Sequence, residues 1–391
     1  MNKRDYFAIF GGGGIRGLAY CGAYKALLEN NINLTGYAGS SIGAVFATLL
    51  ALKYNYDEIY EILSNTGFEM FIDLNLDLKK EIAVSKGNIF YDWIKEKIER
   101  KFYQENYKKG QNEPVTFFDI KENLIVYSVN LTTMKFIEFS KEKTPDFEVA
   151  KAVRASVSMP GLFTPLEYNN NLLVDGDLLK STPLWRVSNF IKNLDERIIE
   201  FRLEDNSSEK KINNSLEYLN RVYNAISGFA TDYIIDLYKE KDKFDYIKIN
   251  TKDISVIDFL ISKEKKKMLF ETGYNETNSY FREFFPKKKD KINEKYKKLL
   301  NHLLKFQEYF NKNKLIDCYL NLCETFIFLC EEKKYLDLKI YNLISDFKNK
   351  FSENYYNKKF LIFQKSFLKN KEELSKDYLE ILREVAGKIQ I

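Results

Sequence analysis

The sequence predicts an α/β layered domain with a mostly parallel central sheet, followed by an all-α extension. Two observations lead to this prediction. Short apolar runs alternate with amphipathic helical segments as far as residue 286. Beyond that point the turn-forming residues almost vanish, because all six prolines lie at or before Pro286 and Gly387 is the only glycine in residues 287–391. We therefore predict one domain over residues 1–286 and a helical extension over 287–391.

The first apolar run, YFAIF, is continuously apolar, as expected for a parallel strand buried on both faces. Residues 56–110 show helical periodicity without strand signals, which indicates a cap-like insertion covering one side of the sheet. The predicted strands are residues 6–10, 34–39, 123–131, 135–140, 171–174, 197–204 and 246–250, and helices are predicted at 17–29 and 42–53.

The helical extension is basic, with 23 Lys and Arg against 15 Asp and Glu in residues 287–391, whereas residues 1–286 carry 38 against 41. Residues 315–330, LIDCYLNLCETFIFLC, contain 12 apolar and two charged side chains. We therefore predict that this segment is the buried central helix of a bundle. A membrane-binding role, a regulatory or self-association role and a purely solvated bundle all stay open for the extension.

Composition excludes several classes of protein. No apolar stretch of about 20 residues is present, so we expect no membrane-spanning helix. The N-terminus lacks the apolar core of a signal peptide, which favours a cytoplasmic location with peripheral contact at the inner membrane face. The cysteines, Cys21, Cys318, Cys323 and Cys330, lack metal-binding or redox spacing, so we expect buried free thiols, no metal and no cofactor.

A glycine-rich turn follows the first predicted strand. Its Gly12-x-Gly14-x-x-Gly17 spacing fits a loop that holds a nucleotide phosphate at a helix N-terminus. The same loop could instead donate backbone N–H groups to an oxyanion that develops during attack on an ester. The spacing alone leaves both alternatives open.

The next motif favours the oxyanion. Gly39-x-Ser41-x-Gly43 lies between a predicted strand and a predicted helix, which is the position of a nucleophile elbow. A dinucleotide-binding fold would carry Asp or Glu at the end of this second strand to bind the ribose. Here the strand ends in Gly-Ser-Ser, so we predict that Ser41 is a nucleophile.

A serine needs a base to accept its proton, and the chain contains one histidine, His302, in the helical extension. We expect His302 to be a surface or packing residue, which leaves a carboxylate as the base. The candidate is Asp175, which follows the strand-like run 171–174 and begins the turn Asp175-Gly176-Asp177. Calcium binding is the weaker alternative, because the spacing of an EF-hand loop is absent.

Taken together, these motifs resemble those of the patatin-like phospholipase family, and the resemblance covers roughly residues 5–285. It implies a three-layer α/β/α domain that hydrolyses carboxylic esters of glycerolipids or phospholipids through a serine–aspartate dyad. Two positions depart from the family pattern: Gly11 stands where Asp is frequent, and Asp177 stands where a small residue is usual. A second carboxylate beside the base should raise its pKa. The residues assigned by this resemblance are Ser41 and Asp175 as the dyad, Gly12, Gly13 and Gly14 as the oxyanion loop, and Arg16, Gly17, Gly39, Gly43 and Gly176 as supporting motif positions.

The resemblance also implies a membrane phospholipid or lysophospholipid as substrate and no nucleic acid partner; a homo-oligomer stays open. Arg16 is expected to orient the loop or to contact a lipid phosphate. Two alternatives remain: a membrane-damaging phospholipase effector gated by its extension, and a nucleotide-binding protein that uses the glycine loop. Candidate residues lining the route to lipid are Phe68, Met70, Phe71 and Ile72.

Overall fold

The computed structural model describes residues 4–66, 68–74, 83–178, 197–204, 242–256, 258, 260–333, 335–356 and 360–389, with isolated residues between 212 and 235. This part of the chain forms two compact units. The first reaches from the N-terminal strand to Arg282, and the second begins at Glu283 and also includes Asp242.

The first unit is built on one mixed sheet, and the predicted mostly parallel α/β architecture is confirmed. In the described chain its order is β5-β6-β3-β2-β1-β7-β8, with β4 also paired to β3. The pairs among β1, β2, β3, β7 and β8 are parallel, whereas β4, β5 and β6 pair antiparallel to their neighbours. The strands are β1 (Arg4–Phe10), β2 (Ile32–Gly39), β3 (Asn123–Asn130), β4 (Lys135–Ser140), β5 (Leu166–Tyr168), β6 (Asn171–Asp175), β7 (Arg197–Glu204) and β8 (Phe244–Asn250).

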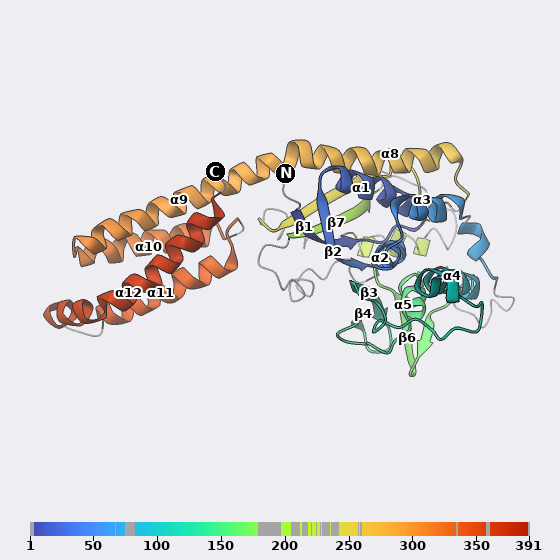
Figure 1. Ribbon diagram of the computed structural model, residues 1–391, viewed down its shortest axis with the longest axis horizontal. Helices are drawn as coiled ribbons and strands as arrows, with labels where there is room; N and C mark the ends of the chain where they lie inside the picture. The colour runs from blue at the N-terminus through green and yellow to red at the C-terminus, as the bar shows by residue number, and fades with distance from the viewer. Residues whose placement is uncertain are drawn as a thin grey trace. The chain divides into compact units, whose positions relative to one another are not determined.

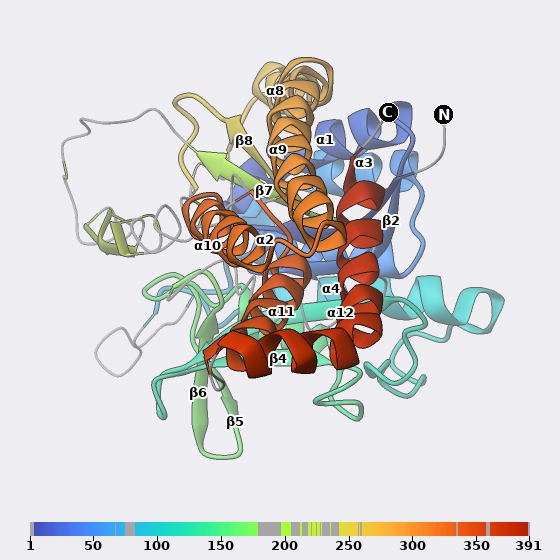
Figure 2. The same ribbon diagram turned by 90° about the vertical axis from the view of Figure 1, so that its left-hand side faces the viewer.

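Helices flank this sheet, and Figures 1 and 2 show α8 running alongside α1. Helix α2 packs against β1, β2 and β3, and α5 packs against β3 and β6. The core of the unit includes an aromatic cluster, in which the Phe10 ring stacks on Phe201 with centroids 5.5 Å apart and meets Phe46 edge-on at 4.9 Å. The helices are α1 (Leu18–Glu29), α2 (Ile42–Ala51), α3 (Tyr56–Asn65), α4 (Asn88–Tyr103), α5 (Val149–Ser156) and α8 (Lys263–Ser279).

In the described part of residues 56–110 the regular elements are helices, joined by irregular segments with isolated β-bridges at Leu74 and Ser85. It contains α3, α4 and the short 3-10 helices η2 (Phe68–Phe71) and η3 (Gln104–Asn106). Helix α3 begins with a capping box in which Asn55 and Glu58 satisfy each other's backbone N–H groups.

The second unit is a helical bundle of α9 (Phe285–Asn311), α10 (Leu315–Glu331), α11 (Leu338–Tyr356) and α12 (Phe360–Lys388). Its core is centred on Phe306, whose ring packs against Phe347, Phe351 and Tyr378. The amphipathic patterns of these segments therefore bury one face of each helix, which is what a bundle requires.

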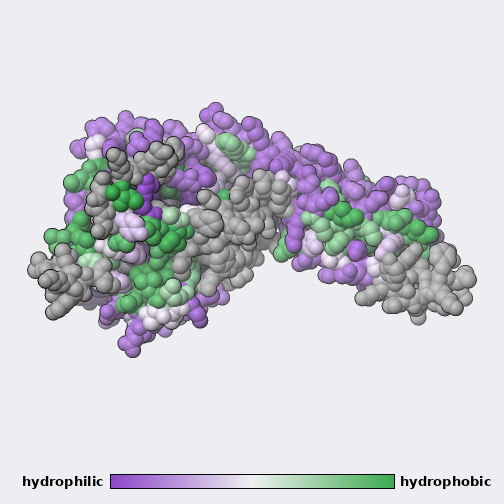
Figure 3. Space-filling model, turned by 180° about the vertical axis from the view of Figure 1, so that it is seen from behind, coloured by the Kyte–Doolittle hydropathy of each residue, from purple (hydrophilic) through white to green (hydrophobic). Residues whose placement is uncertain are grey.

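Residues 315–330 are helical, but the prediction that they form the buried central helix of the bundle is wrong. Helix α10 packs one face into the bundle, but Ile316, Leu320 and Ile327 are 53%, 55% and 58% exposed. These three positions are spaced by four and seven residues and so share the outer face. Figure 3 shows hydrophobic residues gathered on one side of this unit.

The cysteine prediction is correct for Cys21 and Cys318, which are buried and free, but Cys330 is exposed and Cys323 is only partly buried. His302 is partly buried in α9, where its ring stacks on Phe328 at 5.4 Å, as expected for a packing residue. None of the helices described here is long and apolar enough to cross a membrane.

Candidate active site

The glycine loop directly follows β1. Gly14 has a φ of 56°, and a Cβ at this position would lie 2.2 Å from the Val256 carbonyl oxygen, so only glycine fits. The buried Arg16 guanidinium donates from Nε to the Gly13 carbonyl at 3.1 Å, and the Tyr20 hydroxyl donates to the Gly11 carbonyl at 2.7 Å. The Arg16 side chain therefore stabilises the conformation of the glycine loop from its buried side.

Ser41 lies on a tight turn between β2 and α2. Its φ of 52° and ψ of −129° form a backbone conformation that non-glycine residues rarely adopt. A Cβ on Gly39 would lie 2.2 Å from the Gly43 carbonyl oxygen, because the start of the helix presses directly on the end of the strand. The Gly39-x-Ser41-x-Gly43 motif thus has the geometry of a nucleophile elbow.

The sheet brings the elbow and the Asp175 turn together. Strands β2 and β6 both pair with β3, but along different parts of it: Gly39 is opposite Val126, and Asp175 is opposite Ser128. Because β2 is parallel to β3 and β6 is antiparallel, their carboxyl ends point toward each other. Ser41 and Asp175 therefore lie close together near the middle of β3, although 134 positions separate them in the sequence.

The Asp175 carboxyl is almost fully buried, with 1% exposure. It accepts hydrogen bonds from the Asp177 N–H at 2.8 Å and from the Tyr223 hydroxyl at 3.0 Å, and the Ser41 side chain lies close enough to lower its pKa. Burial, followed by the negative charge of Asp177, raises the pKa of Asp175 to about 7, although these hydrogen bonds pull it the other way. A carboxylate with this pKa can accept a proton near neutral pH.

Asp177 is also buried, and its Oδ1 atom accepts three hydrogen bonds. The donors are the Gly12 N–H at 3.3 Å, the Ser40 hydroxyl at 3.0 Å and the Arg202 guanidinium at 3.1 Å. The expected influence of Asp177 on the base has the predicted direction, since its charge raises the pKa of Asp175.

The three glycines of the predicted oxyanion loop differ in their N–H groups. The Gly12 N–H donates to Asp177. For Gly13 and Gly14, the described residues provide no acceptor to the backbone N–H. Gly14 also lines the same cavity as Ser41, so its N–H group is available to a reacting oxygen near Ser41.

Ser156 connects the nucleophile elbow at Ser41 with the turn at Gly176. This residue was not predicted from the sequence. Its hydroxyl accepts from the Ser41 N–H at 3.0 Å and donates to the Tyr127 carbonyl at 2.6 Å, while its own carbonyl accepts from the Gly176 N–H at 3.4 Å. Gly176 approaches β3 so closely that a Cβ would lie 2.3 Å from the Tyr127 oxygen. Tyr223 and Arg202 were likewise not predicted, because no motif marks them.

A small apolar cavity of about 60 Å³ opens at Ser41. Of the four residues expected to line a lipid route, Phe71 lines this cavity, Met70 and Ile72 do not, and the side chain of Phe68 lies outside the described residues. The cavity wall is fixed by Ser85, which exchanges backbone hydrogen bonds with Leu162 and Thr164. Its lining consists of Gly14, Ser41, Ile42, Val45, Phe71, Phe90, Val157, Met159, Leu162, Phe163 and Val256.

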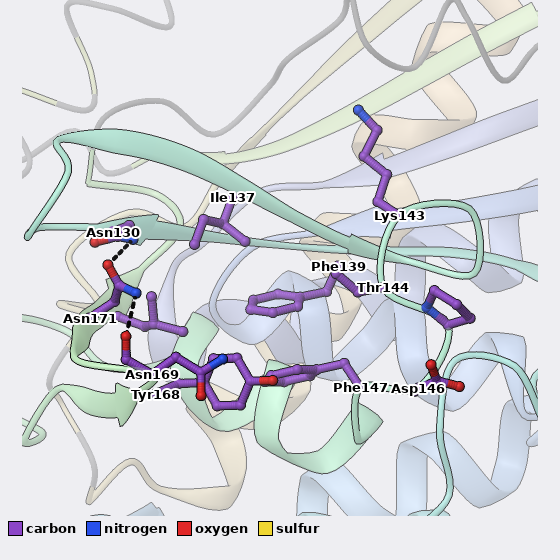
Figure 4. Close-up of a pocket in the computed structure, with 12 residues that line it drawn as sticks. Asn130, Ile137, Phe139, Lys143, Thr144, Asp146, Phe147, Tyr168, Asn169 and Asn171 are labelled. Carbon is purple, nitrogen blue, oxygen red and sulfur yellow. Dashed lines mark hydrogen bonds between the residues drawn. The ribbon is translucent and has the colours of Figure 1, made fainter.

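A second hollow, of about 430 Å³, lies at the edge of the sheet and contains none of the predicted site residues. Figure 4 shows Ile137 and Phe139 of β4 on one side and Phe147 and Tyr168 on the other. At one end, Asn130 donates to the Asn171 side chain at 3.0 Å. No group of three or more metal-binding side chains occurs within the described part of the chain.

Comparison with known proteins gives four informative similarities. Residues 8–187 match the family described as patatin-like phospholipase. An uncharacterized protein of Acanthamoeba polyphaga mimivirus is 30% identical over 272 residues, covering 67% of this chain and 89% of the relative. A probable lipid hydrolase of Invertebrate iridescent virus 6 is 28% identical over 181 residues, covering 45% of this chain and 61% of the relative. The crystal structure of VipD from Legionella pneumophila is similar with a TM-score of 0.50 at 14% identity, over 88% of each chain, which shows a common fold.

Proposed function

Since the chain belongs to the patatin-like phospholipase family, we propose that residues 1–286 form a serine hydrolase that cleaves carboxylic esters of phospholipids or lysophospholipids. The observation that carries this proposal is that strand pairing brings Ser41 close to Asp175, a buried carboxyl with a pKa raised to about 7. Without a histidine in this unit, Asp175 is the group placed to activate the serine.

In the first half of the reaction, the Ser41 hydroxyl oxygen attacks the ester carbonyl carbon and its proton passes to the Asp175 carboxylate. The carbonyl oxygen becomes an oxyanion, which accepts hydrogen bonds from the Gly13 and Gly14 N–H groups. Collapse of this intermediate breaks the bond to the alcohol, which leaves with the proton held by Asp175. The acyl group is then bound as an ester to the Ser41 oxygen, which is the acyl-enzyme.

In the second half, water attacks the acyl carbon while Asp175 accepts a proton from it. The bond to the Ser41 oxygen breaks, the proton returns to Ser41, and a free fatty acid is released. Both halves use the same two side chains and the same two N–H groups, so the chemistry needs only groups that this site contains.

The substrate class is supported by the cavity at Ser41, which is walled by aliphatic and aromatic side chains such as Phe90 and Leu162. An acyl chain would bury its methylene groups here at about 0.8 kcal/mol each. The similarity to a probable lipid hydrolase points to the same class.

The test is hydrolysis of a short-chain nitrophenyl ester and of phosphatidylcholine vesicles by purified full-length protein. Ser41→Ala and Asp175→Asn should each lower kcat by at least about a thousandfold, because each removes a participant in the bond-making step. Ser64→Ala and Asp146→Asn, which change residues outside the site, are the matched controls and should hydrolyse the ester normally. Substantial hydrolysis by Ser41→Ala, or binding of NAD or ATP by the wild type with no esterase activity, would contradict the proposal.

A further inference from the structure

We propose that Asp177 is a positioning residue that fixes the oxyanion loop against the nucleophile elbow through its carboxylate. This inference rests on the proposed function, because it assigns Asp177 a role in the same reaction. The role differs from that of Asp175: the Asp177 side chain accepts from the glycine loop, the elbow and Arg202, whereas Asp175 is the base beside Ser41.

One carboxylate oxygen connects three elements that must keep a fixed arrangement. Oδ1 of Asp177 accepts from the Gly12 N–H of the loop, from the Ser40 hydroxyl of the elbow and from Arg202 of β7. Ser40 is the immediate neighbour of Ser41, and Gly12 is the immediate neighbour of Gly13. A single oxygen therefore sets the distance between the nucleophile and the first oxyanion donor.

Steric contacts reinforce these hydrogen bonds. A Cβ on Gly12 would lie 2.9 Å from the carboxyl carbon of Asp177, and a Cβ on Gly11 would lie 2.8 Å from a guanidinium nitrogen of Arg202. The ion pair thus lies directly against the glycine loop, and both members are buried, with exposures of 5% and 7%. By occupying the Gly12 N–H, Asp177 leaves the oxyanion to the next two N–H groups of the loop.

The Asp177 N–H completes the connection, since it donates to Oδ1 of Asp175 at 2.8 Å. The backbone of Asp177 therefore positions the base while its side chain positions the loop. Charge explains the presence of Arg202: two neighbouring buried carboxylates repel each other, and a guanidinium 3.1 Å from Asp177 offsets part of that repulsion.

The test separates position from charge by comparing Asp177→Asn with Asp177→Ala, using Asp146→Asn as a control at an exposed site. All three partners of Oδ1 are donors, so the amide oxygen of Asn can still accept from them, whereas Ala cannot. We expect kcat for ester hydrolysis to fall by roughly a hundredfold in Asp177→Ala, comparable to the loss of one oxyanion donor. KM should change less than about threefold, and Asp177→Asn should recover at least about tenfold of the lost kcat.

If Asp177→Ala fails to fold, Asp177→Ser replaces it, because the shorter side chain cannot reach both Gly12 and Ser40. The proposal is overturned if the Ala or Ser variant keeps kcat within about threefold of wild type, if Asn is no better than Ala, or if KM rises as much as kcat falls. Ser41→Ala is measured in parallel. Hydrolysis that survives in Ser41→Ala would refute the proposed function itself, which is a different result from any of these.

Discussion

Replacing Asp175 by Asn should make the protein more stable above neutral pH while removing its activity. The substitution keeps the size of the side chain and leaves an oxygen to accept from the Asp177 N–H and the Tyr223 hydroxyl, which both bond to Oδ1 in the wild type. It removes a charge that burial disfavours. Substitutions that stabilise a protein but abolish its activity are expected at active sites, because the residues needed for catalysis often lower stability.

The sign and size follow from the raised pKa of Asp175. Its pKa moves from 3.8 to about 7 on folding, so between these pH values the folded protein holds a proton that the unfolded chain has released. The contribution of Asp175 to stability is therefore fully present below pH 4 and is lost as the pH rises through 7. At 1.36 kcal/mol per pKa unit, the loss is about 4 kcal/mol.

The assay is thermal unfolding of wild type, Asp175→Asn and the control Asp146→Asn from pH 4 to pH 8.5. At about 2 °C per kcal/mol for a unit of this size, the Tm of Asp175→Asn relative to wild type should rise by roughly 8 °C across this range. The control should show no such trend. A Tm difference between Asp175→Asn and wild type that stays constant with pH would refute a raised pKa for Asp175.

Two further predictions concern packing. Leu162→Trp should narrow the cavity at Ser41, lowering kcat/KM for a long-chain nitrophenyl ester at least about tenfold more than for the acetate; an equal loss for both esters would show that the acyl chain binds elsewhere. Phe306→Ala, in the core of the helical bundle, should destabilise that unit by about 3–5 kcal/mol in urea unfolding, and an unchanged midpoint would contradict the packing described for α9.

The elements of the fold were predictable where local pattern decides structure. The predicted strands 135–140 and 197–204 are observed as β4 and β7. Both contain apolar residues and are flanked by turn-forming residues, so the local sequence marks them. Helix α2 ends at Ala51 rather than at residue 53. The strand β5 was not predicted, since three residues carry too little pattern to distinguish a strand from a loop.

The helix α10 was predicted at the right place, but its burial was predicted incorrectly, for a physical reason. Its composition is apolar enough for complete burial, but burial depends on how many neighbours a helix has, and composition does not contain that information. The outer face with Ile316 and Leu320 shows that a bundle of this size covers α10 on one side.

In the candidate site, the sequence supplied the residues that a motif marks and missed those that only the tertiary structure brings together. Ser41 and Asp175 stand in recognisable turns, but the register of β3 that joins them depends on pairing between distant strands. Ser156 and Tyr223 contact the site through hydrogen bonds between distant parts of the chain and belong to no catalytic motif. Residues 152–166, AVRASVSMPGLFTPL, include Ser156 and resemble the family's segment ahead of the base, which is the one sequence signal that points toward Ser156.

The most direct test of the account measures how fast a fluorophosphonate labels Ser41 between pH 5 and pH 9. If the Asp175 carboxylate activates the serine, the labelling rate should rise through an apparent pKa near 7 and then level off. In Asp175→Asn the rate should be slow and independent of pH. A wild-type rate that is flat across this range, or an Asn variant that labels as fast as wild type, would contradict activation of Ser41 by Asp175.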